Sequence, residues 1–102
     1  YFALEGLGQL INTMKLIKSI NPSLKLGGVI LTMYDSRTKL SSNVVKDVRE
    51  FFEESAFKTI VPRNVRLSEA PSHGKTIFEY DDKSTGALAY NNLAKEFLNR
   101  FF

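Results

Sequence analysis

Apolar residues recur every three or four positions from residue 3 to residue 20, which is the spacing of an amphipathic helix. Proline cannot continue the hydrogen-bond ladder of a helix, so Asn21-Pro22 marks its end. The sequence therefore predicts one helix over residues 3–20, with Lys15 and Lys18 on its solvent side. The apolar positions are Leu4, Leu7, Leu10, Ile11, Met14, Ile17 and Ile20.

Two apolar runs further along the chain predict parallel strands joined by a helix. Residues 26–34 form a nearly continuous apolar run, which suits a strand covered on both faces, and residues 57–61 form a second, shorter run. Between them, Ser41 or Ser42 is expected to cap a helix that continues to about residue 54. A strand, a helix and a strand in this order predict a βαβ unit with a right-handed crossover. The apolar stripe expected on the helix is Val44, Val45, Val48, Phe51 and Phe52.

The last third of the chain predicts a long loop followed by a helix. Residues 62–76 are polar, contain two prolines and show no clear period, so they predict the longest irregular segment and the natural place for function. A brief apolar patch at residues 77–80 follows, and Ser84 or Thr85 then caps a helix to about residue 100. The expected apolar stripe of this helix is Leu88, Leu93, Ala94, Phe97, Leu98 and Phe101.

Two strands do not make a stable open sheet, so the missing strands are expected upstream of this sequence. The chain begins with Tyr1-Phe2-Ala3 and no Met, which is typical of a piece of a longer protein. We therefore interpret residues 1–102 as a single partial domain. On its own it is expected to expose a strand edge and apolar surface, and to dimerise or aggregate.

Composition narrows the possible functions only slightly. The chain has 102 residues, of which 43% are hydrophobic and 25% charged, as in an ordinary folded domain. Its net charge of +3 permits contact with nucleic acid or anionic lipid without requiring either. The absence of cysteine excludes disulfide scaffolds, thiolate zinc sites and cysteine nucleophiles. No signal-peptide pattern appears, no apolar run reaches the length of a membrane span, and no membrane contact is expected.

Three candidate motifs for chemistry are weak. Gly74-Lys75-Thr76 matches the end of a phosphate-binding loop, but Glu69 stands where that loop needs its first glycine, so a surface turn is favoured. His73 has no partner at metal-ligand spacing. The acidic pairs 53–54 and 81–82 read as solvated surface. The sequence predicts no catalytic residue and no metal site.

Basic residues follow both predicted strands. Arg37 and Lys39 come after the first, and Arg63, Arg66 and Lys75 after the second. The carboxyl ends of parallel strands meet at one edge of a sheet, which is where open α/β folds bind ligands. Convergent arginines there could hold phosphates of a nucleotide or of DNA, but composition alone favours scattered surface charge.

Three segments give a more specific indication. YFALEGL (residues 1–7), GVILTMYD (residues 28–35) and VPRNVRLSEAPSHGK (residues 61–75) resemble, in this order, the C-terminal half of the ParA/Soj family of partition ATPases. The resemblance covers essentially the whole chain. It implies an α/β fold, the C-terminal half of a deviant-Walker P-loop NTPase sandwich. It also implies a cytoplasmic, nucleoid-associated parent protein that binds ATP and Mg²⁺ and dimerises.

The same resemblance implies partners and site residues. The family binds DNA without sequence preference, works with a ParB/Spo0J-type partner in chromosome or plasmid segregation, and in some bacteria regulates sporulation. Arg37 and Arg66 match DNA-contacting arginines of the family, and Lys39 and Lys75 are further candidates by proximity. The residues that match the adenine pocket are Met33, Pro62, Arg63, Asn64 and Val65.

The family's phosphate-binding loop and switch carboxylates do not occur in this sequence. The chain alone is therefore not expected to hydrolyse ATP or to hold a cofactor, since phosphoryl transfer depends on that loop and Mg²⁺. A stand-alone basic interaction or DNA-binding module without nucleotide chemistry is the alternative.

Overall fold

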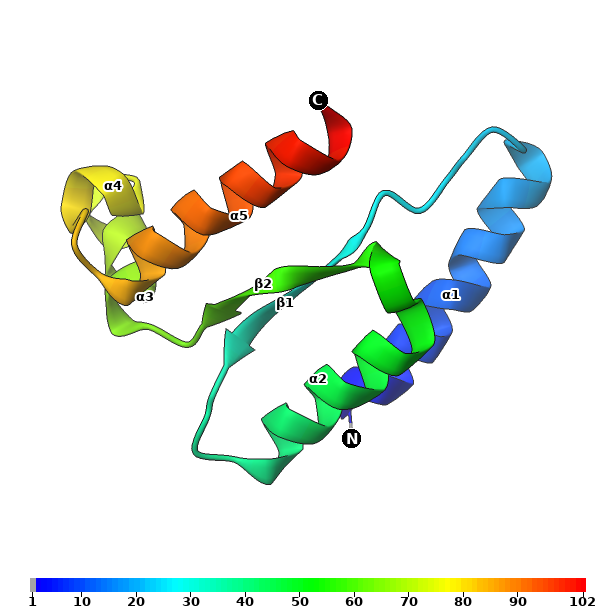
Figure 1. Ribbon diagram of the computed structural model, residues 1–102, viewed down its shortest axis with the longest axis horizontal. Coiled ribbons are helices and arrows are strands. Elements are labelled where there is room, and N and C mark those ends of the chain that lie inside the picture. Colours follow the sequence, from blue (N-terminus) through cyan, green and yellow to red (C-terminus); the bar gives the residue numbers. More distant parts are fainter. Residues whose placement is uncertain (1) are drawn as a thin grey trace.

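The computed structural model describes residues 2–102 as a short parallel sheet with flanking helices. The elements in chain order are α1 (Phe2–Ile20), β1 (Val29–Tyr34), α2 (Lys39–Phe52), η1 (Glu53–Ser55), β2 (Ala56–Pro62), α3 (Val65–Glu69), η2 (Ala70–His73), α4 (Ile77–Tyr80) and α5 (Thr85–Phe101). Figure 1 shows the two strands running between α5 on one side and α2 on the other. The predicted α/β class and the β1–α2–β2 unit are confirmed.

The two strands are parallel, so their carboxyl ends lie at the same edge of the sheet (Figure 1). β1 begins at Val29 and not at residue 26 as predicted, because Gly27 and Gly28 precede it and glycine is a poor strand former. Gly28 is also tightly packed: a Cβ atom there would lie 2.4 Å from Cε1 of Phe57. The paired residues are Val29 with Ala56, Leu31 with Ile60, and Tyr34 with Pro62, with register irregularities between them.

The core is small and centres on β2. Ala56, Phe57 and Val61 of this strand are buried, and Val48 of α2 is buried with them. The other buried apolar residues are Ala70, Ile77, Ala87 and Ala89. Large apolar side chains elsewhere stay exposed, including Leu16, Ile17 and Ile20 on α1 and, against expectation, Phe51 on α2.

Helix α5 packs on the sheet with a different face from the one predicted. Leu88, Phe97, Leu98 and Phe101 of the expected apolar stripe are exposed. The docked face instead includes Glu96, whose carboxylate accepts the backbone N–H groups of Lys58 and Thr59, each at 2.8 Å. Arg100, one turn on, pairs with Glu96 at 3.1 Å, donates to the carbonyl of Ala56 at 3.1 Å, and lies over the Phe57 ring. These polar contacts to the backbone of β2 fasten the C-terminal half of α5 to the sheet.

The cap of α2 and the structure of residues 62–76 also differ from the predictions. Thr38, not Ser41 or Ser42, caps α2 by accepting the Ser41 N–H, whereas the Ser84 cap of α5 is confirmed. Residues 62–76 were expected to be irregular but contain α3, which Asn64 caps, and η2, which ends at Gly74 with a left-handed φ of 64°. The apolar patch after them is the short helix α4, begun by a capping box between Thr76 and Glu79.

A strained backbone position follows α2. Glu53 has φ 51° and ψ −119°, a region that side chains other than glycine avoid. Glu53→Gly is expected to raise the free energy of unfolding by about 1 kcal/mol, because glycine removes the strain. Urea denaturation measures this. Glu54→Gly is the matched control, since Glu54 is not among the positive-φ residues, and it is expected to be neutral or destabilising. Equal effects of the two variants would contradict the strain at Glu53.

Candidate nucleic-acid interface

The carboxyl ends of β1 and β2 border an open groove of about 600 Å³. This is the edge at which open parallel sheets bind ligands. A hydrogen bond from the Arg63 N–H to the Tyr34 carbonyl, 2.8 Å long, ties the two strand-end segments together. The residues lining the groove are Tyr34, Asp35, Ser36, Arg37, Pro62, Arg63, Asn64, Val65 and Ser68.

Arg37 is held in place by Asp35. Its Nε and Nη2 atoms each donate to a different oxygen of the carboxylate at 2.9 Å, and its backbone N–H donates to the same group at 3.0 Å. These hydrogen bonds, helped by the positive charges of Arg37 and Arg63, lower the pKa of Asp35 to about 2. The Arg37 side chain nevertheless remains 83% exposed. Asp35 therefore orients the guanidinium while leaving it accessible from solvent.

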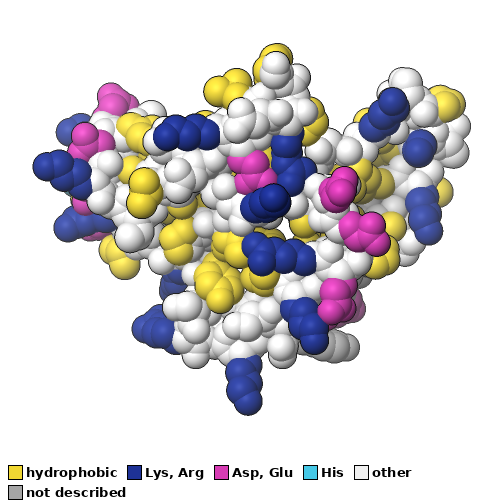
Figure 2. Space-filling view, viewed as in Figure 1, with side chains coloured by type: hydrophobic (Ala, Val, Ile, Leu, Met, Phe, Trp, Pro, Cys, Tyr) yellow, Lys and Arg dark blue, Asp and Glu magenta, His cyan; other side chains and the backbone are white. Residues whose placement is uncertain are grey.

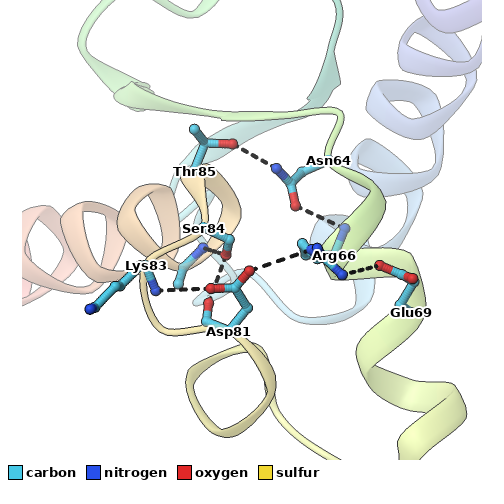
Figure 3. Close-up of polar contacts among 8 residues, drawn as sticks. Asn64, Arg66, Glu69, Asp81, Lys83, Ser84 and Thr85 are labelled. Carbon is cyan, nitrogen blue, oxygen red and sulfur yellow. Dashed lines mark hydrogen bonds and ion pairs between the residues drawn. The ribbon is translucent and has the colours of Figure 1, made fainter.

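Arg66 is held by two carboxylates, one on its own helix α3 and one directly after α4. Figure 3 shows its guanidinium between Glu69, at 3.2 Å, and Asp81, at 3.4 Å. Asn64 fixes the start of α3 by accepting the Arg66 N–H at 3.0 Å, and its amide donates to Thr85 at 2.6 Å. This contact joins α3 to the first turn of α5, so the position of Arg66 depends on both helices.

The two predicted DNA-binding lysines are exposed and lie outside the groove. Lys39 is the first residue of α2, directly after the loop that carries Arg37. Lys75 follows Gly74 at the end of η2. Within residues 5–102, neither lysine forms an ion pair with a carboxylate. In Figure 2, a few separate dark blue Lys and Arg side chains project at the lower left and bottom, whereas basic and acidic side chains are mixed across the centre.

The predicted adenine-pocket residues are divided between two depressions. Pro62, Arg63, Asn64 and Val65 line the main groove. Met33 instead lines a smaller depression of about 280 Å³, which shares Pro62, Arg63 and Asn64 with the groove. Met33 is 70% exposed and has φ 55°, and it lies between Leu31 and Tyr34, where the strand register is irregular.

Comparison with known proteins gives a clear relationship. No family model matches the chain. It is 55% identical over 97 residues to the sporulation initiation inhibitor protein Soj of Bacillus subtilis, covering 94% of this chain and 38% of that protein. It is 52% identical over 101 residues, or 98% of its length, to the chromosome-partitioning ATPase Soj of Treponema pallidum, of which it covers 40%. The chromosome partitioning protein ParA of Myxococcus xanthus is likewise 52% identical over 98% of the chain, which covers 36% of that protein.

The chain is homologous to part of the Soj/ParA partitioning proteins. The resemblance found in the sequence is thereby confirmed. The chain spans about two fifths of the length of these relatives.

The sequence alone did not predict the acidic residues beside Arg37 and Arg66. Glu69 stands three positions after Arg66, a spacing that pairs side chains on a helix and could have indicated this contact. Asp35 stands two positions before Arg37 in a loop, where helical spacing gives no indication. Asp81 is 15 positions from Arg66, as 81 − 66 = 15, and only the packing of the helices brings it there. Gly86 permits that packing, because a Cβ atom there would lie 2.5 Å from Cγ of Leu67 on α3.

The weak motifs stay outside the groove. Lys75 and the glycine before it form the turn after η2, and the His73 ring stacks on Tyr80 with 4.9 Å between centroids. Among the described residues, no group of three or more His, Cys, Asp or Glu side chains is placed to hold a metal ion. Within the same part of the chain, no helix is both long and apolar enough to cross a membrane.

Proposed function

We propose that the chain is the C-terminal part of a ParA/Soj-type partitioning ATPase, here called the parent protein, and that it supplies the DNA-contacting edge. The parent protein binds ATP, self-associates, binds DNA without sequence preference and works with a ParB/Spo0J-type partner, in the cytoplasm and on the nucleoid. Identity of 52–55% over nearly the whole chain to proteins named Soj or ParA supports this proposal.

The observation that carries the DNA-binding role is the placement of Arg37. Its guanidinium lies at the ligand-binding edge of the sheet, is oriented by two hydrogen bonds and is 83% exposed. A guanidinium held in this way loses little further entropy when it binds a phosphate. Arg66 and the exposed Lys39 and Lys75 extend the basic surface beyond the groove.

Of the parts of a bound nucleotide, only the base matches the surface that the described residues form. Pro62, Asn64 and Met33 offer apolar and amide surface around the smaller depression, as a neutral aromatic base requires. Glu69 occupies the place of the first glycine in a phosphate-binding loop, and the described residues contain no acidic cluster for Mg²⁺. In the proposed parent protein, residues beyond this sequence hold the phosphates and the metal ion.

Fluorescence anisotropy of the parent protein with ATP and Mg²⁺ tests the proposal. Three short duplexes of unrelated sequence are expected to bind with affinities within about twofold of each other, and more weakly as salt rises from about 50 to 200 mM. A preference of about 100-fold or more for one duplex would indicate base recognition and contradict the proposal. Equal binding by the 102-residue chain without ATP would favour the stand-alone DNA-binding module instead.

A further inference from the structure

The groove at the sheet edge contains a second arginine, Arg63, in addition to Arg37. Arg63 follows β2, and its backbone is fixed beside Asp35 by the 2.8 Å hydrogen bond to Tyr34. Its side chain is exposed and lines the groove together with Arg37. In the part of the chain that the structure describes, Arg63 takes part in no ion pair, whereas Arg37 and Arg66 each have acidic partners.

Asp35 is the acidic residue of the groove. It accepts from Nε and Nη2 of Arg37, which leaves both N–H groups of Nη1 and the second N–H group of Nη2 available to a ligand. The low pKa of Asp35, about 2, keeps the carboxylate ionised at neutral pH, and the positive charge of Arg63 contributes to that shift. Two arginines and one aspartate therefore give the groove a net charge of 2 − 1 = +1.

We propose that Arg63 is a phosphate-binding residue of the DNA interface, and that a single phosphodiester group binds in the groove between the guanidiniums of Arg63 and Arg37. The inference rests on the proposed function and changes the role that the resemblance implies for Arg63, from lining the adenine pocket to contacting DNA. Ser36 and Ser68, which also line the groove, offer hydroxyl donors to the same phosphate.

Charge and shape favour a phosphodiester over the phosphates of a nucleotide. A phosphodiester carries one negative charge, which the net charge of the groove balances. A nucleoside triphosphate carries several, and the groove would leave most of them uncompensated. The groove is also open to solvent, which gives a nucleic-acid backbone access to both arginines.

The test compares the salt dependence of DNA binding by the parent protein with ATP and Mg²⁺. Removing one phosphate contact is expected to reduce the log–log slope by about 0.9, which corresponds to about eightfold weaker binding near 0.1 M salt. Arg63→Ala, measured at saturating ATP, is expected to show this loss of slope and of DNA affinity. Arg63→Lys keeps the charge and is expected to retain most of the slope. Lys18→Ala on α1, an equal loss of charge far along the chain from the groove, is expected to behave as wild type.

The outcomes separate the inference from the proposed function. A slope for Arg63→Ala equal to that of Lys18→Ala, or a loss of ATP binding without a loss of DNA binding, would overturn the role of Arg63. If the Arg37→Ala/Arg66→Ala variant still loses slope in that case, the proposed function stands. Absence of salt-dependent DNA binding by the wild-type protein would overturn both. Thermal unfolding by circular dichroism confirms that each variant is folded.

Discussion

Glu96→Ala is expected to lower the free energy of unfolding by about 2–3 kcal/mol. Its carboxylate accepts two backbone N–H groups of β2, from Lys58 and Thr59, and pairs with Arg100. Alanine leaves both strand N–H groups without this acceptor and removes the acidic partner of Arg100, and a hydrogen bond to a charged group contributes a net stabilisation of about 1.5–3 kcal/mol. The loss is a large share of the stability of a small domain.

Urea denaturation at neutral pH measures this effect. Glu50→Ala removes the same charge from the exposed surface of α2 and is expected to change stability by less than about 0.5 kcal/mol. Equal losses for the two variants would mean that Glu96 does not fasten α5 to the sheet.

The same carboxylate predicts a pH dependence. Burial raises the pKa of Glu96, but hydrogen bonds from Thr59 and Lys58 and the charge of Arg100 outweigh burial and lower the pKa from 4.5 to about 2. A lowered pKa means that the stabilisation is complete above about pH 4.5 and is lost as the pH falls towards 2. The Glu96→Ala protein is expected to lack this contribution to acid sensitivity.

Arg37→Ala/Arg66→Ala is expected to reduce the log–log salt slope of DNA binding by about 1.8, or 0.9 for each phosphate contact. Affinity is expected to fall equally for all DNA sequences, because neither arginine reads a base in this account. The fall in affinity is expected to exceed the charge effect alone. In this double variant the carboxylates no longer pair with arginine, and their negative charges would repel the DNA phosphates. These carboxylates are Asp35, Glu69 and Asp81.

The control for this variant is Lys15→Ala/Lys18→Ala, which removes the same charge from the exposed side of α1. Anisotropy of the parent protein with ATP measures both. An unchanged slope for the arginine variant, or the same loss for the lysine variant, would show that binding depends on net charge and not on the sheet edge.

Local sequence patterns predicted the β1–α2–β2 unit because two apolar runs and the helical stripe between them follow one another in the order of such a unit. They failed for α5, since the docked face of that helix includes Glu96 and Arg100, which bind backbone groups of β2. They also failed for residues 62–76, where α3 and η2 have only five and four residues, too few to show a period. Their boundaries depend on single residues, Asn64 and Gly74.

The sequence predicted the candidate site in part, as it predicted the fold in part. The rule that parallel strands end at one edge was enough to place Arg37 and Arg63 near each other. It could not show that the groove excludes Arg66 and Lys75, nor that Asp81 reaches Arg66 across the packed helices. Both facts depend on how α3, α4 and α5 fold together.

Hydrogen–deuterium exchange of the ATP-bound parent protein, with and without duplex DNA, tests most directly whether this sheet edge is the DNA interface. The account predicts that DNA slows exchange in residues 35–39 and 63–66 and leaves α1 around Lys15 and Lys18 unchanged. Protection confined to α1 or to the middle of α2, with none at the ends of β1 and β2, would contradict it.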